Sequence, residues 1–267
     1  MLIESSVHLP FGFAMLQEIF HAPEIESLVR VLLRWTHFVA GIAWIGLLYF
    51  FNLVNVPFQK NLDADTKKKV NPDLLTRALW YFRWGALVTV LAGLMYYAMY
   101  ILKGDVVNAN ADGGDANTWL ILIVWLVIAV AVFAIEFFLI TRVPALTKDG
   151  KVLAVVVAIL VIVMAILIVY WLNSSLTVPD GDSYASNKTH SIGIGGALGI
   201  IMLLNVWGII WPSQKRIIAA TAGTGPAAPP ELARRAFLAS RTNAWLSLPM
   251  LFFMATSHGD YVILGKN

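Results

Sequence analysis

The strongest constraint on this chain is a series of six long apolar stretches. Each is long enough to cross about 30 Å of hydrocarbon as a helix, at roughly 1.5 Å per residue. A bilayer core offers no partner to backbone N–H and C=O groups, so apolar segments of this length fold as helices. The sequence therefore predicts an all-α, polytopic transmembrane helix bundle of about six spans, at residues 28–53, 78–103, 118–141, 152–173, 190–212 and 237–257.

The composition fits a protein that lives in a bilayer. Hydrophobic residues make up 59% of the chain and charged residues 13%, against about 25% charged residues in a soluble domain. The sixth stretch is the weakest of the series because it contains Arg241, Asn243 and Pro249. We expect it to be a kinked or partly buried helix, since neighbouring helices can satisfy backbone groups that a proline frees.

Loop charges predict how the spans are oriented. Basic residues concentrate in loops 54–77, 142–151 and 213–236, whereas loops 104–117 and 174–189 and the segment before Arg30 are mainly acidic. The positive-inside rule therefore predicts three cytoplasmic loops and both termini outside. We divide the chain into an interfacial or extracytoplasmic segment at 1–27, which does not resemble a signal peptide, and a transmembrane domain at 28–267.

Several classes of cofactor and partner are excluded at this stage. The chain contains no cysteine, so it cannot attach a c-type haem covalently or hold an iron–sulfur cluster through thiolates. Its net charge of +3 gives no reason to expect nucleic acid as a partner. The expected surroundings are the lipid bilayer itself.

The histidines are distributed unevenly. With the orientation above, His37, His190 and His258 place one imidazole each towards the outer leaflet, from three different spans. Imidazole is the usual ligand of haem b, and two imidazoles from facing helices form a bis-histidine site. We therefore predict a haem b whose iron is held by a pair from this set. A non-haem metal on the same histidines is the alternative, and His8 and His21 are interpreted as membrane-surface anchors.

The sequence around His37 favours a haem. Gly41 lies one turn further along the same span, where the missing side chain leaves room for a flat macrocycle. Arg30 and Arg34 lie on the same helix face, where guanidinium groups can pair with haem propionates. Alternatively, Arg30 extends to lipid headgroups. The glycines that follow His190 serve helix packing equally well; they are Gly193, Gly195, Gly196 and Gly199.

A second polar set lies towards the cytoplasmic side. Arg83, Glu136 and Arg241 fall within three different spans. Ionisable groups inside a membrane bundle tend to pair, so we expect a structural ion pair between Glu136 and one of the two arginines. A proton or quinone access point is the functional alternative. Asn205, in the middle of the fifth span, is expected either to bond between helices or to line a cavity.

Three segments resemble the membrane domain of the bacterial membrane-bound urate hydroxylases. They are RWTHFVAGIAWIG at 34–46, GGALGIIMLLNVWGIIWPSQKRII at 195–218 and NAWLSLPMLFFMATSHGDY at 243–261. The first also resembles other haem b membrane families, such as the copper-resistance D type. In the urate hydroxylases a multi-helix domain of the inner membrane precedes a C-terminal cytochrome c domain. The resemblance covers most of residues 28–261 and implies a multi-pass protein of the bacterial inner (cytoplasmic) membrane.

This chain shares only part of the residue pattern of the family that it resembles. His37 and His258 match family histidines, whereas His190 lies about one turn before the corresponding family position. The family has a His-Asn pair where this chain has Thr242 and Asn243. We expect the cytochrome c domain to be absent. The resemblance thus implies the scaffold and two histidines more strongly than the oxidation of urate.

Three functions are compatible with these observations. The first is a haem b redox subunit that passes electrons from a quinol or small organic donor to a cytochrome c or a larger membrane complex. The second is a urate-oxidising enzyme that uses a separate cytochrome c. The third is a structural or assembly subunit without a cofactor. No catalytic residue is identified, and a transporter is less favoured because no internal repeat or matching pair of broken helices is found.

Overall fold

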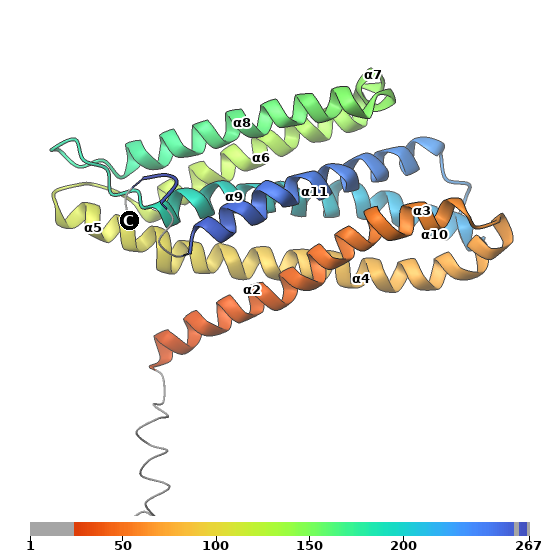
Figure 1. The fold of residues 1–267 in the computed structure, drawn as a ribbon, viewed down its shortest axis with the longest axis horizontal. Helices are drawn as coiled ribbons and strands as arrows, with labels where there is room; N and C mark the ends of the chain where they lie inside the picture. Colours follow the sequence, from red (N-terminus) through yellow and green to blue (C-terminus); the bar gives the residue numbers. More distant parts are fainter. Residues whose placement is uncertain (1–23, 259–261, 266–267) are drawn as a thin grey trace, which may run out of the picture.

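The computed structural model describes residues 24–258 and 262–265. Helices account for most of these residues, and the long ones run side by side along one axis (Figure 1). The predicted all-α helix bundle is thereby confirmed. The expected interfacial segment lies almost wholly outside the described residues. The long helices are α2 Ile25–Tyr49, α4 Ala64–Tyr96, α6 Thr118–Arg142, α8 Gly150–Ser175, α9 Asn187–Asn205 and α11 Pro230–Thr256.

The helices continue well beyond the apolar stretches. Many residues that the sequence predicted to be in loops are helical. Short α and π segments continue three of the spans directly. A further short helix, α7 Pro144–Lys148, joins α6 to α8. The extensions are η1 Phe50–Asn55 and α3 Val56–Lys60, η2 Tyr97–Leu102 and α5 Lys103–Ala111, and η3 Val206–Ile210 and α10 Trp211–Thr221.

Side-chain caps fix where several helices begin. Four helices follow a residue whose side-chain oxygen accepts a hydrogen bond from a backbone N–H of the first turn. Such caps satisfy donors that have no partner inside the helix. The capping residues are Asp63 for α4, Asn117 for α6, Asp149 for α8 and Ser186 for α9.

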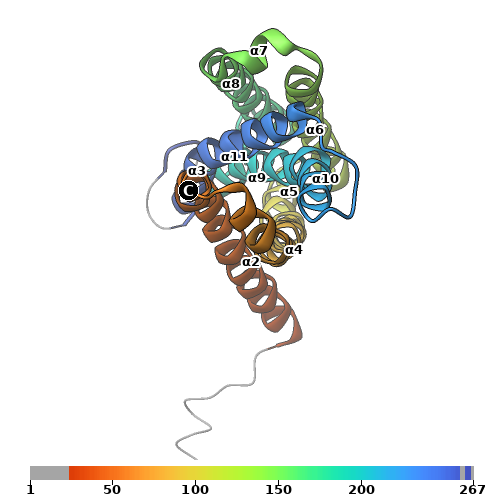
Figure 2. The same cartoon turned by 90° about the vertical axis from the view of Figure 1, so that its right-hand side faces the viewer.

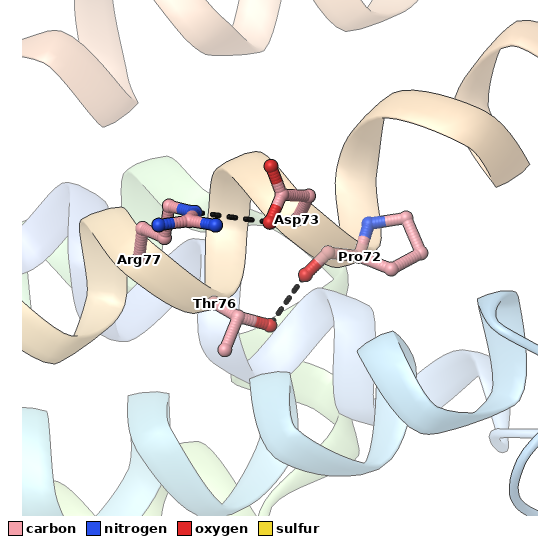
Figure 3. Close-up of polar contacts among 4 residues, drawn as sticks. All are labelled: Pro72, Asp73, Thr76 and Arg77. Carbon is pink, nitrogen blue, oxygen red and sulfur yellow. Dashed lines mark hydrogen bonds and ion pairs between the residues drawn. The ribbon is translucent and has the colours of Figure 1, made fainter.

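The first turns of α4 are polar and contain a proline (Figure 3). Pro72 has no N–H to donate, and the hydroxyl of Thr76 donates to its carbonyl oxygen one turn later. On the same stretch Arg77 forms an exposed ion pair with Asp73, with 2.9 Å between Nε and Oδ1. This part of α4 therefore extends beyond the apolar stretch that starts near residue 78.

Helix α9 lies in the centre of the bundle and contacts α4, α6, α8 and α11 (Figure 2). Nearly all its residues are buried. Its glycines explain the close approach of its neighbours. A Cβ on Gly195 would lie 3.2 Å from the carbonyl oxygen of Met250 and 3.3 Å from Cβ of Phe253, both on α11. A Cβ on Gly193 would lie 2.9 Å from Leu172 of α8.

Five helical segments are long and apolar enough to cross a membrane. They contain the first five predicted spans, and α11 does not reach the same apolarity within the described residues. Helix α11 nevertheless packs along α9 over its length. The sequence had indicated this helix as the weakest span for the same reason, its polar residues. The inside–outside orientation stays a prediction from loop charge.

The packing of α9 against α11 generates a testable prediction. The change Gly195→Leu forces a side chain against the backbone of α11, and we expect it to destabilise the protein by about 1–3 kcal/mol or more. Gly104→Leu is the matched control, because a Cβ there would meet nothing within 4 Å. Unfolding in detergent measures both variants. Equal stabilities would contradict this account of the α9–α11 interface.

Candidate functional site: an apolar cavity with two histidines

A cavity of about 460 Å³ opens among α2, α4, α9 and α11. This volume lies in the range of small-molecule and cofactor sites. The lining is overwhelmingly apolar, with His37, His258 and Arg34 among its few polar side chains. Phe38 and Ile42 line the cavity and are also 55% and 73% exposed on the outside of the bundle. The wall that α2 contributes to the cavity is therefore also exposed at the surface of the bundle.

His37 is held in one defined orientation by α4. Its Nδ1 lies 2.7 Å from the backbone carbonyl oxygen of Thr89. A carbonyl oxygen can only accept, so Nδ1 is the donor, and in the neutral imidazole Nε2 is the nitrogen that keeps a lone pair. The hydroxyl of Thr89 lies 3.1 Å from the same Nδ1 and donates to the backbone oxygen of His37 at 2.8 Å. Imidazoles that bind metal are usually oriented by such a bond on the other nitrogen.

His258, just past the end of α11, has the same arrangement. Its Nδ1 lies 3.2 Å from the backbone carbonyl oxygen of Met254, one turn earlier, and 2.8 Å from the hydroxyl of Ser257. The carbonyl again requires Nδ1 to be the donor, which leaves Nε2 as an acceptor or ligand. The structure thus brings two of the three predicted histidines to one cavity, each with Nδ1 bonded to a backbone carbonyl oxygen.

A stripe of small residues on α4 positions His37 and was not identified from the sequence. Gly85, Thr89 and Gly93 lie at intervals of four residues and face α2. A Cβ on Gly93 would lie 2.7 Å from Nδ1 of His37, and one on Gly85 would lie 3.2 Å from a backbone oxygen of α2. This spacing of small residues is typical of closely packed membrane helices. The pattern was visible in the sequence of the second span.

Gly41 has a double role. It lines the cavity, as the prediction of space for a cofactor requires. A Cβ at this position would also lie 3.2 Å from the hydroxyl oxygen of Thr89. The absence of a side chain therefore serves the packing of α2 on α4 as well. On the opposite wall Gly196 and Gly199 of α9 line the cavity.

The two arginines before His37 have different surroundings. Arg34 lines the cavity, and its Cζ lies 5.8 Å from the ring centroid of Tyr96. Arg30 does not line it. Its guanidinium lies over Tyr100, 4.6 Å from the ring centroid, and 3.3 Å from a carboxylate oxygen of Glu26. Of the two predicted propionate partners, the structure brings only Arg34 to the cavity.

His190 is not brought to this cavity. It is fully buried at the start of α9, and its Nδ1 lies 3.1 Å from the backbone oxygen of Ser186. Its Nε2 has no hydrogen-bond partner among the described residues. A Cβ on Gly265 would lie 2.9 Å from the ring, so the C-terminal segment covers His190 closely. The sequence predicted all three histidines towards the outer leaflet, but the packing of the helices separates His190 from the other two.

Sequence reasoning also missed two groups in the cavity wall. Met250 and Met254 of α11 line the cavity. Trp44 of α2 lines it too, is almost fully buried, and its indole Nε1–H has no acceptor among the described residues. Methionine and tryptophan in apolar spans carry no signal that separates a cavity wall from an ordinary core.

The expected ion pair of Glu136 is wrong. Among the described residues Glu136 forms no ion pair; its Oε1 accepts a hydrogen bond of 2.8 Å from Asn205 instead. Arg83 stacks on Trp211, with 3.7 Å from Cζ to the ring centroid, and Arg241 lies over Phe237. Both arginines lie against aromatic faces, an interaction that sequence spacing did not indicate, and Nε of Arg83 is buried without a hydrogen-bond partner among the described residues. Asn205 bonds between helices, which was one of its two predicted roles.

A comparison with known families gives one match. The model described as "Urate oxidase N-terminal" matches residues 62–266, which is more than half of the chain. The match contains α4 to α11 and both His190 and His258, and it begins after α2, so Arg34, His37 and Gly41 lie outside it. No curated protein and no solved structure matches the chain.

The contact between Gly93 and His37 can be tested. In Gly93→Ala the new methyl group lies where the imidazole now packs, so we expect the Nδ1–H bond to Thr89 to break. Nitrogen-15 NMR of labelled histidine reports the tautomer and should show His37 lose its fixed Nδ1–H form. Gly46→Ala is the control, because that glycine also lines the cavity yet has nothing within 4 Å of its Cβ position. An unchanged His37 signal in Gly93→Ala would contradict the geometry.

Proposed function

The chain belongs to the urate oxidase N-terminal family, and from this premise we propose that it is a membrane-integral electron-transfer protein that binds haem b. The observation that carries the proposal is an apolar cavity with two imidazoles, His37 and His258, each with Nδ1 bonded to a backbone carbonyl. When bound, haem b supplies reversible one-electron chemistry at its iron.

The residues present fit such a group. His37 and His258 would hold the iron through Nε2, because Nδ1 of each ring is bonded to a backbone carbonyl oxygen. The glycines of the cavity wall leave space for a flat ring, and the apolar lining suits its faces. Arg34 pairs with a propionate, since a carboxylate inside a membrane protein needs a charged partner. His190 has no part in this site.

We propose that electrons enter from the side of α2 and leave towards the outer side. The α2 wall of the cavity is exposed at the protein surface, which would give a lipid-soluble quinol access from the bilayer; a small organic donor is the alternative. The acceptor is a cytochrome c or a larger membrane complex on the outer side, where loop charge places the ends that carry the acidic loops. We assign the protein to the bacterial inner (cytoplasmic) membrane on the resemblance to the urate hydroxylases.

A second candidate is the oxidation of urate with a separate cytochrome c. One observation besides the family favours it: Trp44 lines the cavity, and its indole Nε1–H is buried behind that wall without an acceptor among the described residues. A buried donor without a partner costs free energy, and a carbonyl oxygen of a flat heterocycle would satisfy it. The rest of the lining offers few polar groups for a ligand as polar as urate, which is why electron transfer is the first proposal.

The haem proposal is tested by optical spectroscopy of the purified protein. We expect a b-type α-band in the reduced-minus-oxidised spectrum and about one haem per chain by pyridine hemochrome. His37→Ala and His258→Ala should each lose most of the haem, because each removes one iron ligand. His190→Gln is the control and should keep the parent's haem content per folded protein, since His190 does not line the cavity.

The outcomes separate the candidate functions. Reduction of the haem by quinol but not by urate supports the first proposal, and reduction by urate supports the second. A folded protein without haem that co-purifies with a stable membrane complex would overturn both and identify a structural or assembly subunit. Loss of haem in His190→Gln but not in His37→Ala would contradict the ligand assignment.

A further inference from the structure

Glu136 is the one acidic side chain that is buried among the described residues. It lies on α6, six residues before the end of that helix at Arg142, and is 1% exposed. At about 1.5 Å per residue this is roughly 9 Å from the helix end. Neither Glu136 nor its hydrogen-bond partners line the cavity described above. The cavity and its proposed haem therefore leave this carboxyl unexplained.

Two asparagines close around Glu136. Nδ2 of Asn205, on α9, donates to Oε1 of Glu136 at 2.8 Å and to Oδ1 of Asn243, on α11, at 2.9 Å. Asn243 in turn donates from Nδ2 to the backbone oxygen of Met202 at 2.9 Å. Both asparagines are fully buried. The cluster thus joins three helices, and each asparagine already has a fixed donor direction.

No cation neutralises this carboxyl within the described part of the chain. The ion pairs formed there are Arg30–Glu26 and Arg77–Asp73. On α11, Arg241 lies over Phe237, and Arg235 donates to the backbone oxygen of Thr141 at 2.9 Å. Arg83 of α4 stacks on Trp211.

The helices packed on α6 carry their other titratable groups near their ends. These groups are Lys151 and Tyr170 on α8, Lys188 and His190 on α9, Glu231 and Arg234 on α11, Lys148 on α7, and Tyr97 and Tyr100 on η2. An ionised Glu136 would therefore be a buried charge without a counter-charge, which is costly in a membrane bundle.

One atom of the cluster has no partner. Oδ1 of Asn205 is buried and accepts no hydrogen bond from the described residues. A carboxylate cannot satisfy it, because a carboxylate has no hydrogen to donate. A neutral carboxylic acid can, since its hydroxyl is a donor while its carbonyl oxygen still accepts. The unpartnered oxygen of Asn205 and the absence of a nearby cation both favour a protonated, neutral Glu136.

We propose that Glu136, Asn205 and Asn243 form a proton-binding site in the bundle. Glu136 holds the proton as a neutral acid: its carbonyl oxygen accepts from Nδ2 of Asn205, and its hydroxyl donates to Oδ1 of the same amide. Asn243 fixes the orientation of that amide through its own bond to Nδ2. The site binds one proton, on the carboxyl group of Glu136. The π-helical segment η3 begins directly after Asn205, and such segments are frequent at functional sites.

Infrared spectroscopy of the full chain in detergent tests this proposal. At neutral pH we expect the carbonyl band of a protonated carboxylic acid, which shifts when the protein is prepared in D₂O. The band should vanish completely in Glu136→Gln. That variant should fold with the parent's melting temperature, because its amide can accept from Nδ2 and donate to Oδ1 of Asn205. Glu231→Gln is the control: this exposed glutamate lies on α11, and the band should persist without it.

Two further arms keep the outcome decisive. Asn205→Leu removes both hydrogen bonds of the acid and should shift the band without abolishing it. If Glu136→Gln does not fold, labelling the parent with carbon-13 at the side-chain carboxyl of glutamate shows whether the band comes from a glutamate, and Glu136 is the buried glutamate among the described residues. Absence of a protonated glutamate band at neutral pH in the labelled parent overturns the proposal. So does a band that survives Glu136→Gln.

Discussion

The contact of α2 with α4 at Thr89 is the interaction on which the cavity depends. One threonine holds both the backbone of His37, at 2.8 Å from its carbonyl oxygen, and the imidazole, through its own carbonyl oxygen at 2.7 Å from Nδ1. Glycines one turn to either side let the helices approach closely enough for these bonds. A bilayer core provides no competing water, so the bonds fix the ring firmly. The cavity between α2 and α11 keeps a ligand-ready Nε2 as a result.

The absence of water in the bilayer core also determines how polar side chains around Glu136 are bonded. Polar side chains buried in the bundle bond to one another or to backbone carbonyls across helices, as Asn243 does with Met202 and Trp125 with Gly193. Two of these polar sets do not share residues. One set surrounds the cavity with imidazoles, and the other encloses a single carboxyl. The proposed electron transfer and the proposed proton binding therefore involve separate places in one scaffold.

Much of the fold could be predicted from hydropathy, because a long apolar segment of this kind folds as a helix in a bilayer. The helical extensions could not, since polar segments such as the start of α4 are helical through caps and tertiary packing. Among the site residues, His37, His258, Arg34 and Gly41 were predicted and line one cavity. His190 and Arg30 do not line it. Whether a residue lines the cavity depends on the direction of its side chain, which loop charge does not predict. The pairing of Arg83 with Trp211 depends on contacts between spans far apart in the sequence.

The central claim is that His37 and His258 hold one haem iron between them. Electron paramagnetic resonance of the oxidised, purified protein tests this most directly, because the spin state of ferric haem reports its axial ligands. The account predicts a low-spin signal typical of two imidazole ligands, which becomes high-spin or disappears in His37→Ala. A high-spin signal in the unsubstituted protein, or no ferric haem signal from folded protein, would contradict it.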